Sequence, residues 1–160
     1  MAVNLIVAIG KDGAIGRKGD LIWKISDDLK HFKALTLDHS VIMGRKTWES
    51  LPKKPLPNRK NIILTHNRDY KAEGAEIVYS IEDALKIAGE DPFIIGGAEI
   101  YKAFLPYTTH LYLTLINDSC DDADAFLTLD LKNQWKLIDE SPVMHTPSGI
   151  DFRYLTYEKL

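Results

Sequence analysis

The sequence predicts an α/β fold: one mostly parallel central sheet with helices on both faces and an antiparallel hairpin at the C-terminal end. Two observations carry this prediction. Strand-like and helix-like segments alternate along the first part of the chain, and longer strand-like segments follow residue 106. The last two strands flank Pro147-Ser148-Gly149, a turn signal that favours antiparallel pairing.

The individual elements follow from short apolar runs and from helical periodicity. The expected strands are residues 3–9, 40–43, 61–65, 76–79, 92–95, 110–116, 135–138 and 150–157. The expected helices are residues 26–37, 46–50, 81–88 and 98–105, with Ser80 capping the third and Asp83 at its N3 position. Residues 10–23 contain four glycines and predict a long mobile loop, a length typical of lids and binding loops.

Composition narrows the class of protein. A chain of 160 residues with 45% hydrophobic residues can bury a full core, so we expect one domain over residues 1–160. Its net charge is only −3, and acidic and basic residues are evenly mixed along the chain, which argues against a nucleic-acid surface. The lone Cys120 excludes a disulfide framework, and no apolar run suits a membrane or a leader, so we expect a cytoplasmic protein.

Metal chemistry is not expected. The five histidines are scattered along the chain, and Cys120 has no partner at ligand spacing. The acidic stretch at residues 118–124 lacks the glycine and terminal glutamate of a calcium loop, so it predicts a solvated hairpin tip.

Asp28 is the first candidate functional residue, because helical spacing places it on the apolar face of the helix at residues 26–37. A charge that faces the interior needs a partner, and the nearby lysines lie toward the edges of that face, so the partner is expected outside the chain. The apolar arc comprises Ile25, Leu29, Phe32 and Leu35, the lysines are Lys24, Lys30 and Lys33, and Asp27 points away. An alternative stays open, since Ser26 followed by two aspartates is also an ordinary helix start.

Three expected strands end in residues suited to phosphate: Gly44-Arg45-Lys46-Thr47, Thr65-His66-Asn67-Arg68 and Gly96-Gly97-Ala98-Glu99. Ligands of open α/β sheets bind outside the carboxyl ends of the strands. Neither G-x-x-x-x-G-K-[ST] nor G-x-G-x-x-G occurs, so the common nucleotide loops are excluded. Arg45, with His66 or Lys46, could hold the 2′-phosphate that distinguishes NADP from NAD, and dinucleotide binding follows as a hypothesis.

Several motifs, in one order and over nearly the whole chain, resemble the dihydrofolate reductases of the bacterial chromosomal type. They are Ala14-Ile15-Gly16, Trp23 with Asp28 and Phe32, residues 41–50, Pro55-Leu56-Pro57-Asn58-Arg59, residues 95–101 and Tyr112-Leu113-Thr114. The resemblance implies NADPH-dependent reduction of 7,8-dihydrofolate, with hydride transfer to pterin C6 and protonation of N5, in support of one-carbon metabolism and thymidylate synthesis. It also implies a monomer that antifolates inhibit.

The resemblance assigns roles residue by residue. Asp28 would grip the pterin's amidine-like pair of nitrogens and promote protonation of N5 indirectly, with Thr114 supporting the carboxylate and Trp23 ordering a water. The implied catalytic residues are Asp28, Trp23 and Leu21, and the implied substrate contacts are Ile6, Ala8, Asp28, Leu29, Phe32, Lys33, Leu56, Arg59, Ile95 and Thr114. Arg59 resembles the arginine that pairs with the α-carboxylate of folate.

The implied NADPH contacts lie in the glycine loop and at the three strand ends. They are Ala8, Ile15, Gly16, Gly19, Gly44, Arg45, Lys46, Thr47, Leu64, Thr65, His66, Gly96, Gly97, Ala98, Glu99, Ile100 and Tyr101. The family also implies a cis Gly96-Gly97 peptide and a lid that closes over nicotinamide.

The chain departs from the family at a few positions. Ile22 replaces a common proline, Asn58 replaces a usual glycine, the segment at residues 52–55 carries an insert, and Asp20 adds an anion to the lid. Asp124 lies in a stretch that roughly matches a loop that contacts the lid in the family, so the resemblance makes Asp124 a partner of the lid. Two rivals remain: a pterin or pyrimidine reductase of the riboflavin-pathway fold, which would not need Asp28, Thr114 and Arg59 together, and a nucleotide-binding module without catalysis.

Overall fold

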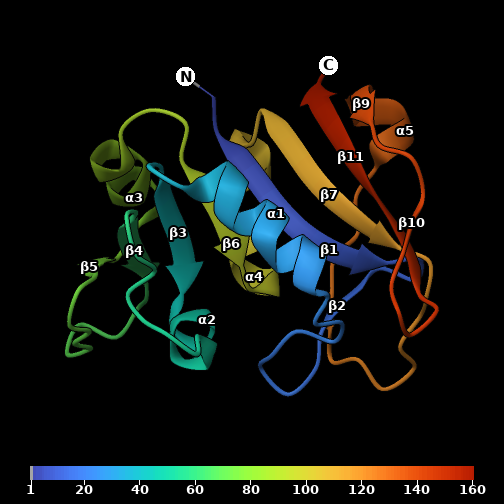
Figure 1. The fold of residues 1–160 in the computed structure, drawn as a ribbon. Helices are drawn as coiled ribbons and strands as arrows, with labels where there is room; N and C mark the ends of the chain where they lie inside the picture. The colour runs from blue at the N-terminus through green and yellow to red at the C-terminus, as the bar shows by residue number, and fades with distance from the viewer. Residues whose placement is uncertain (1) are drawn as a thin grey trace.

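A central twisted sheet forms the core of the protein, which we describe from a computed structural model over residues 2–160. The strand order is β10-β11-β7-β1-β6-β3-β4-β5, and β9 also pairs with β11 (Figure 1). The strands are β1 Asn4–Gly10, β3 Ser40–Gly44, β4 Lys60–Leu64, β5 Glu76–Val78, β6 Phe93–Gly96, β7 His110–Ile116, β9 Trp135–Glu140, β10 Met144–His145 and β11 Asp151–Lys159. Pairing is parallel from β7 to β5 and antiparallel around β11, which confirms the predicted fold class.

Helices cover both faces of this sheet because the residues of β1 alternate between two apolar layers. Leu5 and Val7 pack with α3 and α4, whereas Ile6 packs with residues of α1 and α2. In Figure 1, α1 crosses the near face of the sheet. The helices are α1 Ser26–Thr36, α2 Arg45–Ser50, α3 Ile81–Ala88, α4 Ala98–Phe104 and α5 Leu131–Gln134, with a 3₁₀ turn at Leu105–Tyr107.

The helix starts were predicted unequally well. Ser80 caps α3 as expected, because its Oγ accepts a hydrogen bond of 3.1 Å from the Asp83 N–H. The predicted Ser26 cap is wrong: Ile25 occupies the N-cap position and makes no side-chain capping bond. The Leu29 N–H donates to the Ile25 carbonyl, so Ser26 is already the first helical residue. Its hydroxyl is therefore not at the N-cap position.

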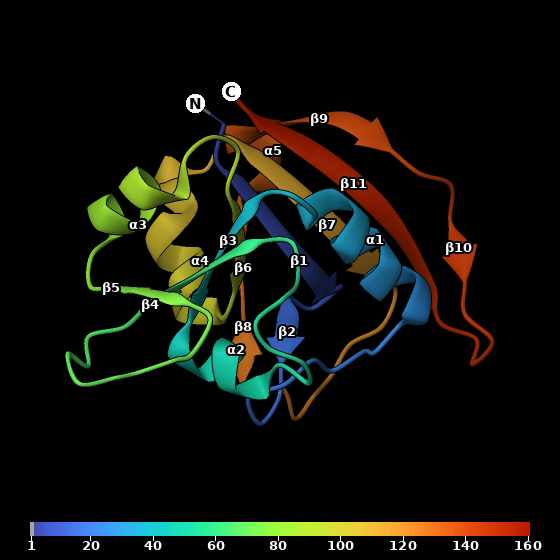
Figure 2. The same ribbon diagram turned by 60° about the vertical axis from the view of Figure 1, so that its left-hand side comes forward.

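The glycine-rich segment is only partly a loop. Within it, β2 (Ala14–Gly16) pairs with β8 (Ala125–Phe126) in a small separate sheet, which Figure 2 shows below the main one. The side chains of Ala14 and Ile15 are buried. The prediction of a uniformly mobile loop is therefore wrong for residues 14–16, whereas residues 17–21 carry mostly exposed side chains.

The acidic stretch at residues 118–124 is solvated as predicted at Asp121, Asp122 and Asp124, which are exposed, but it is not a hairpin tip, because it connects β7 to β8 of the separate small sheet. Asp118 accepts a hydrogen bond from the Trp23 indole, Asp122 pairs with Arg17 at 3.0 Å, and Asp124 accepts a 2.8 Å hydrogen bond from the Lys18 N–H. The isolated pattern could not reveal these partners, since they lie about a hundred residues earlier in the chain. None of the helices within residues 2–160 has the length and apolar character needed to cross a bilayer.

Candidate active site

The candidate site lies between the amino end of α1 and the sheet, near the carboxyl ends of the parallel strands. Register places Ala8 of β1 beside Thr114 of β7, and Thr114 in turn beside Tyr154 of β11. The α1 helix runs across these strands, so its inward side chains face them (Figure 1). This is the edge at which open α/β sheets take ligands.

Asp28 faces this part of the sheet, as its helical position predicts. The Thr114 hydroxyl donates a hydrogen bond of 2.5 Å to its Oδ1. Burial raises the pKa of Asp28, and the Thr114 hydrogen bond and the nearby His31 lower it in part. Among residues 2–160, no Lys or Arg forms an ion pair with Asp28, and Lys24 pairs instead with Asp20. The carboxylate is therefore held by a neutral donor, and none of residues 2–160 supplies it with a cationic partner.

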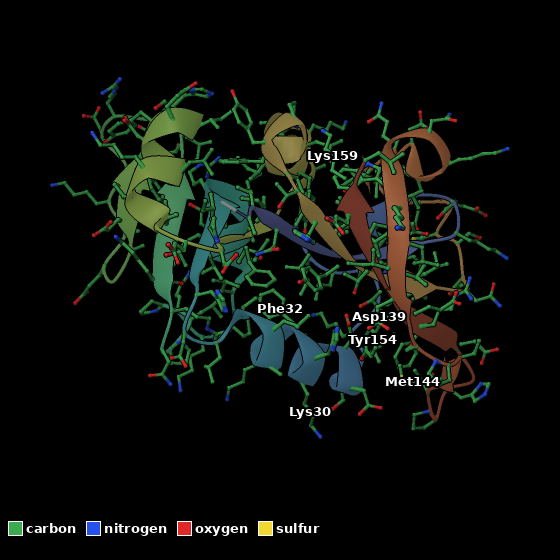
Figure 3. All side chains as sticks on the ribbon, turned by 90° about the horizontal axis from the view of Figure 1, so that it is seen from above. Lys30, Phe32, Asp139, Met144, Tyr154 and Lys159 are labelled. Atoms are coloured by element: carbon green, nitrogen blue, oxygen red, sulfur yellow. The ribbon has the colours of Figure 1, made fainter. Side chains whose placement is uncertain are left out.

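Other α1 side chains divide between the site and solvent. Phe32 lies toward the sheet and Lys30 away from it (Figure 3), and Phe32 packs in the same apolar layer as Ile6. Leu29, expected in the inward arc, is 49% exposed, so that part of the predicted arc is wrong. It lies about 100° further round the helix than Asp28, on the side away from Thr114. Lys33 is exposed as well.

Trp23 is buried below the glycine loop, and its indole N–H donates to Asp118 Oδ2 at 3.0 Å. The resemblance implies that Trp23 orders a water near Asp28; the indole N–H itself is engaged by the Asp118 carboxylate. The same contact lowers the pKa of Asp118. Leu21, the third implied catalytic residue, is 45% exposed on the loop that precedes Trp23.

The implied apolar walls come together in one layer. Ile6 is buried, and Phe32, Leu56 and Ile95 pack against the same cluster, while Ala8 belongs to the adjoining one. Arg59 lies at the far end of α1, where its guanidinium donates to the Thr36 hydroxyl at 3.1 Å and to the Pro57 carbonyl at 2.9 Å. Within residues 2–160 it forms no ion pair, and partial burial lowers its pKa.

The three predicted phosphate-binding strand ends are neighbours in space. Gly44 is in register with Leu64, and Met43 with Gly96, so the segments that follow β3, β4 and β6 lie side by side. The Gly96-Gly97 peptide is cis, as the resemblance implies. Gly96 has a φ of 119°, which side-chain-bearing residues rarely adopt, and a Cβ there would approach the Tyr101 hydroxyl to 3.2 Å, so glycine is needed at this position.

The side chains around these strand ends differ in exposure. Lys46, His66 and Glu99 are exposed, whereas Arg45 and Thr65 are half-buried. Arg45 pairs with Glu49 at 2.8 Å, and that carboxylate also accepts a hydrogen bond from Tyr70. The Tyr101 side chain is buried and its hydroxyl donates to the Ile6 carbonyl at 2.8 Å, so the implied cofactor contact could involve only its backbone.

The expected partnership between Asp124 and the lid segment is present. Asp124 accepts from the Lys18 N–H, and its own N–H donates to the Gly16 carbonyl. Gly19 lies in the exposed turn between Arg17 and Asp20. The Ile15 side chain is buried in the main apolar layer, so a cofactor could contact it only at the edge of that layer.

Sequence reasoning missed the roles of three residues: Asp118, which contacts Trp23, and His31 and Tyr154, which stack beside the Asp28 turn of α1. His31 stacks on Tyr154 with 3.7 Å between ring centroids and 16° between planes. The only available signal was that His31 follows Asp28 by three positions and so shares its helix face. Tyr154 could be found only by knowing that β11 pairs with β7.

Comparison with known proteins now decides among the candidate families. The dihydrofolate reductase family model matches residues 2–159. The chain belongs to the dihydrofolate reductase family. Similar members include those of Mycobacterium leprae, 43% identical over 98% of both chains, and of Bacillus subtilis, 39% identical over 98% of this chain and 94% of that protein.

A solved relative supports the same assignment. Dihydrofolate reductase from Enterococcus faecalis, complexed with NADP(H) and RAB-propyl, matches with a TM-score of 0.88 and 32% identity, covering 99% of this chain and 96% of that chain. A dihydrofolate reductase site also accounts for Asp28, Thr114 and Arg59 together, which the riboflavin-pathway rival does not require.

Asp28→Asn is expected to stabilise the ligand-free protein at pH 7 by about 1 kcal/mol, or roughly 2–4 °C in Tm. Burial raises the folded-state pKa of Asp28 above its unfolded value, so the charged form costs stability above the folded pKa. The gain should fade as pH falls toward the unfolded pKa near 4. Thermal unfolding at several pH values measures it, with the exposed Asp27→Asn as control. An Asp28→Asn protein no more stable than the parent at pH 7 would contradict this account.

Proposed function

We propose that the protein reduces 7,8-dihydrofolate to 5,6,7,8-tetrahydrofolate with NADPH as the hydride donor. The observation that carries the proposal is the Asp28 carboxylate, which is half-buried beside Thr114 with no Lys or Arg paired to it within residues 2–160. A buried anion without a cation is costly, and a ligand that supplies two N–H donors removes that cost.

The pterin ring fits this requirement, because its ring nitrogen and exocyclic amine form an amidine-like pair. One carboxylate can accept two parallel hydrogen bonds from such a pair. The Thr114 hydroxyl already donates to Oδ1 and fixes the orientation of the carboxylate. Asp28 thereby anchors the ring in one orientation, which is the main requirement for aligned transfer.

Asp28 also promotes protonation at pterin N5, although it does not donate that proton directly. An anion close to the ring raises the affinity of the ring system for a proton. The raised pKa of Asp28 brings its own titration closer to the working pH, as is typical of groups in catalytic sites. Trp23 would order a water near the ring, and both Trp23 and Leu21 lie on the loop side of the site.

The remaining substrate contacts are of two kinds. Ile6, Ala8, Phe32, Leu56 and Ile95 form the apolar walls around the pterin and benzoyl rings, and the exposed Leu29 and Lys33 lie at the entrance. Arg59 would bind the α-carboxylate of the glutamate tail. Its guanidinium is held only by neutral acceptors, so an incoming carboxylate meets no competing anion in an ion pair.

The strand ends fit NADPH. Gly44 lies beside the Gly96 strand end and lets β3 pack closely against α4, since a Cβ on Gly44 would come within 2.9 Å of Ile100. Arg45 and Lys46 supply positive charge for the 2′-phosphate, with Thr47, Leu64, Thr65 and His66 beside them. When bound, NADPH supplies the hydride that pterin C6 receives. The segments at residues 15–19 and 96–101 complete the expected contacts.

We further propose that the protein acts as a monomer in the cytoplasm and is inhibited by antifolates. The single cysteine and the mixed surface charge support the cellular location. The amidine-like recognition at Asp28 supports antifolate binding, because inhibitors that present paired nitrogens would compete for the same carboxylate.

The test is the absorbance assay of NADPH oxidation on addition of dihydrofolate, with parent and Asp28→Asn proteins. The parent should oxidise NADPH only when dihydrofolate is present. Asp28→Asn should lose on the order of 10²-fold or more in turnover at neutral pH and recover part of it as pH falls, because the substrate then arrives protonated. NADPH binding without oxidation would favour the non-catalytic rival. An unchanged rate in Asp28→Asn would exclude the role of this carboxylate.

Arg45→Leu is expected to weaken NADPH binding by roughly ten- to a hundredfold, the range for loss of a hydrogen bond to a charged group. NADH should be affected much less, because it lacks the 2′-phosphate. Titration calorimetry with both cofactors measures the difference. Arg153→Leu removes another exposed ion pair, with Glu140 on β9, and serves as control. Equal weakening of NADPH and NADH would place the 2′-phosphate elsewhere.

A further inference from the structure

His31 and Tyr154 form a contact beside Asp28 that the proposed reaction does not use. The imidazole of His31 lies flat on the Tyr154 ring, with 3.7 Å between centroids and 16° between planes. Tyr154 in turn packs edge-on against Phe152, which is buried. The hydroxyl of Tyr154 donates to the Asp27 carbonyl at 3.4 Å. These contacts join β11 to the first turns of α1 (Figure 3).

The α1 helix is also connected to β11 indirectly, through Asp28 and the intervening strand β7. Tyr154 is in register with Thr114, and Thr114 donates to Asp28. His31 follows Asp28 by three residues, which places the two side chains on one helix face, with Cβ atoms about 5–6 Å apart. The stack fixes the imidazole and the Thr114 hydrogen bond fixes the carboxylate, so both groups are held on one face of α1, although no ion pair within 4.0 Å joins them.

We propose that His31 is a titratable positioning residue for Asp28. Tyr154 holds the imidazole on the helix face that carries Asp28, and a protonated imidazole favours the ionised form of the Asp28 carboxylate. The inference rests on the proposed function, because it concerns the carboxylate that anchors the pterin. Its consequence is that Asp28 stays ionised to a lower pH than burial alone would allow.

The electrostatics around His31 agree with this arrangement. Burial lowers the pKa of His31, and the charge of Asp28 raises it in part; reciprocally, His31 lowers the pKa of Asp28. Tyr154 stays neutral, since burial together with Asp28 and Asp27 raises its pKa to about 12. Thr114 on β7 is uncharged, and Asp139 on β9 is exposed and in register with Thr156 rather than with Tyr154.

Proton NMR titration of the full-length, ligand-free protein tests the coupling without any turnover. The His31 ring signal is one of five histidine signals and is assigned by its loss in His31→Phe. In Asp28→Asn its midpoint should move to lower pH, because the neighbouring anion is gone. Asp139→Asn is the matched control and should leave the midpoint in place. An unmoved His31 midpoint in Asp28→Asn would overturn the proposal, whatever the protein's activity.

The role of Tyr154 is tested in the same titration. Tyr154→Leu keeps an apolar side chain but removes the stack, so the His31 ring gains water and its midpoint should move up toward the ordinary histidine value. Tyr154→Phe keeps the stack and should titrate like the parent. Identical midpoints in Tyr154→Leu and the parent would contradict the claim that the stack holds the ring in place.

The link to the reaction is tested by the pH dependence of KM for dihydrofolate. His31→Phe keeps an aromatic ring but cannot take a proton, so Asp28 loses its neighbouring cation and the pH below which KM rises should move upward. His145→Phe, on the exposed β10 strand, is the matched control and should not shift this pH. Coupling seen by NMR with an unmoved KM profile would show that His31 does not position Asp28 for the substrate.

Discussion

The hydrogen bond from Thr114 to Asp28 is the interaction on which the site depends. It joins the first turn of α1 to β7, two segments 86 residues apart in the sequence, and it fixes a carboxylate that burial makes costly. Groups that cost folding stability are concentrated at functional sites. In the proposed function, the ligand offsets the cost at Asp28 by supplying donors.

The sheet order makes this contact possible. Because β7 lies between β1 and β11, the residues that face α1 come from three strands that are distant in sequence: Ala8, Thr114 and Tyr154. On the other side of β1, the order β6-β3-β4 brings the glycine-containing strand ends together. One topology thus places Asp28 and the three predicted phosphate-binding strand ends at the same edge of the sheet, as the proposed binding of pterin and NADPH requires.

A sequence pattern can predict what is local, and the outcome here follows that limit. The strands, the α3 cap at Ser80 and the inward position of Asp28 all follow from short-range periodicity or spacing, and all are confirmed. The β2 and β8 strands, the Asp118 partner of Trp23 and the use of the acidic stretch were missed, because each joins residues about a hundred positions apart. Leu29 was misplaced because it lies at the edge of the apolar arc, about 100° round the helix from Asp28. Periodicity alone does not show how far round the helix the sheet covers the side chains.

The central claim is that Asp28 binds the pterin through two parallel hydrogen bonds. A crystal structure of the full chain with NADPH and folate tests it most directly. We predict that both Asp28 oxygens lie about 2.7–3.0 Å from the pterin ring nitrogen and its exocyclic amine, with the Thr114 hydrogen bond to Oδ1 retained. A pterin bound with these nitrogens directed away from Asp28, or a carboxylate turned away from the ring toward a lysine or arginine of the chain, would contradict it.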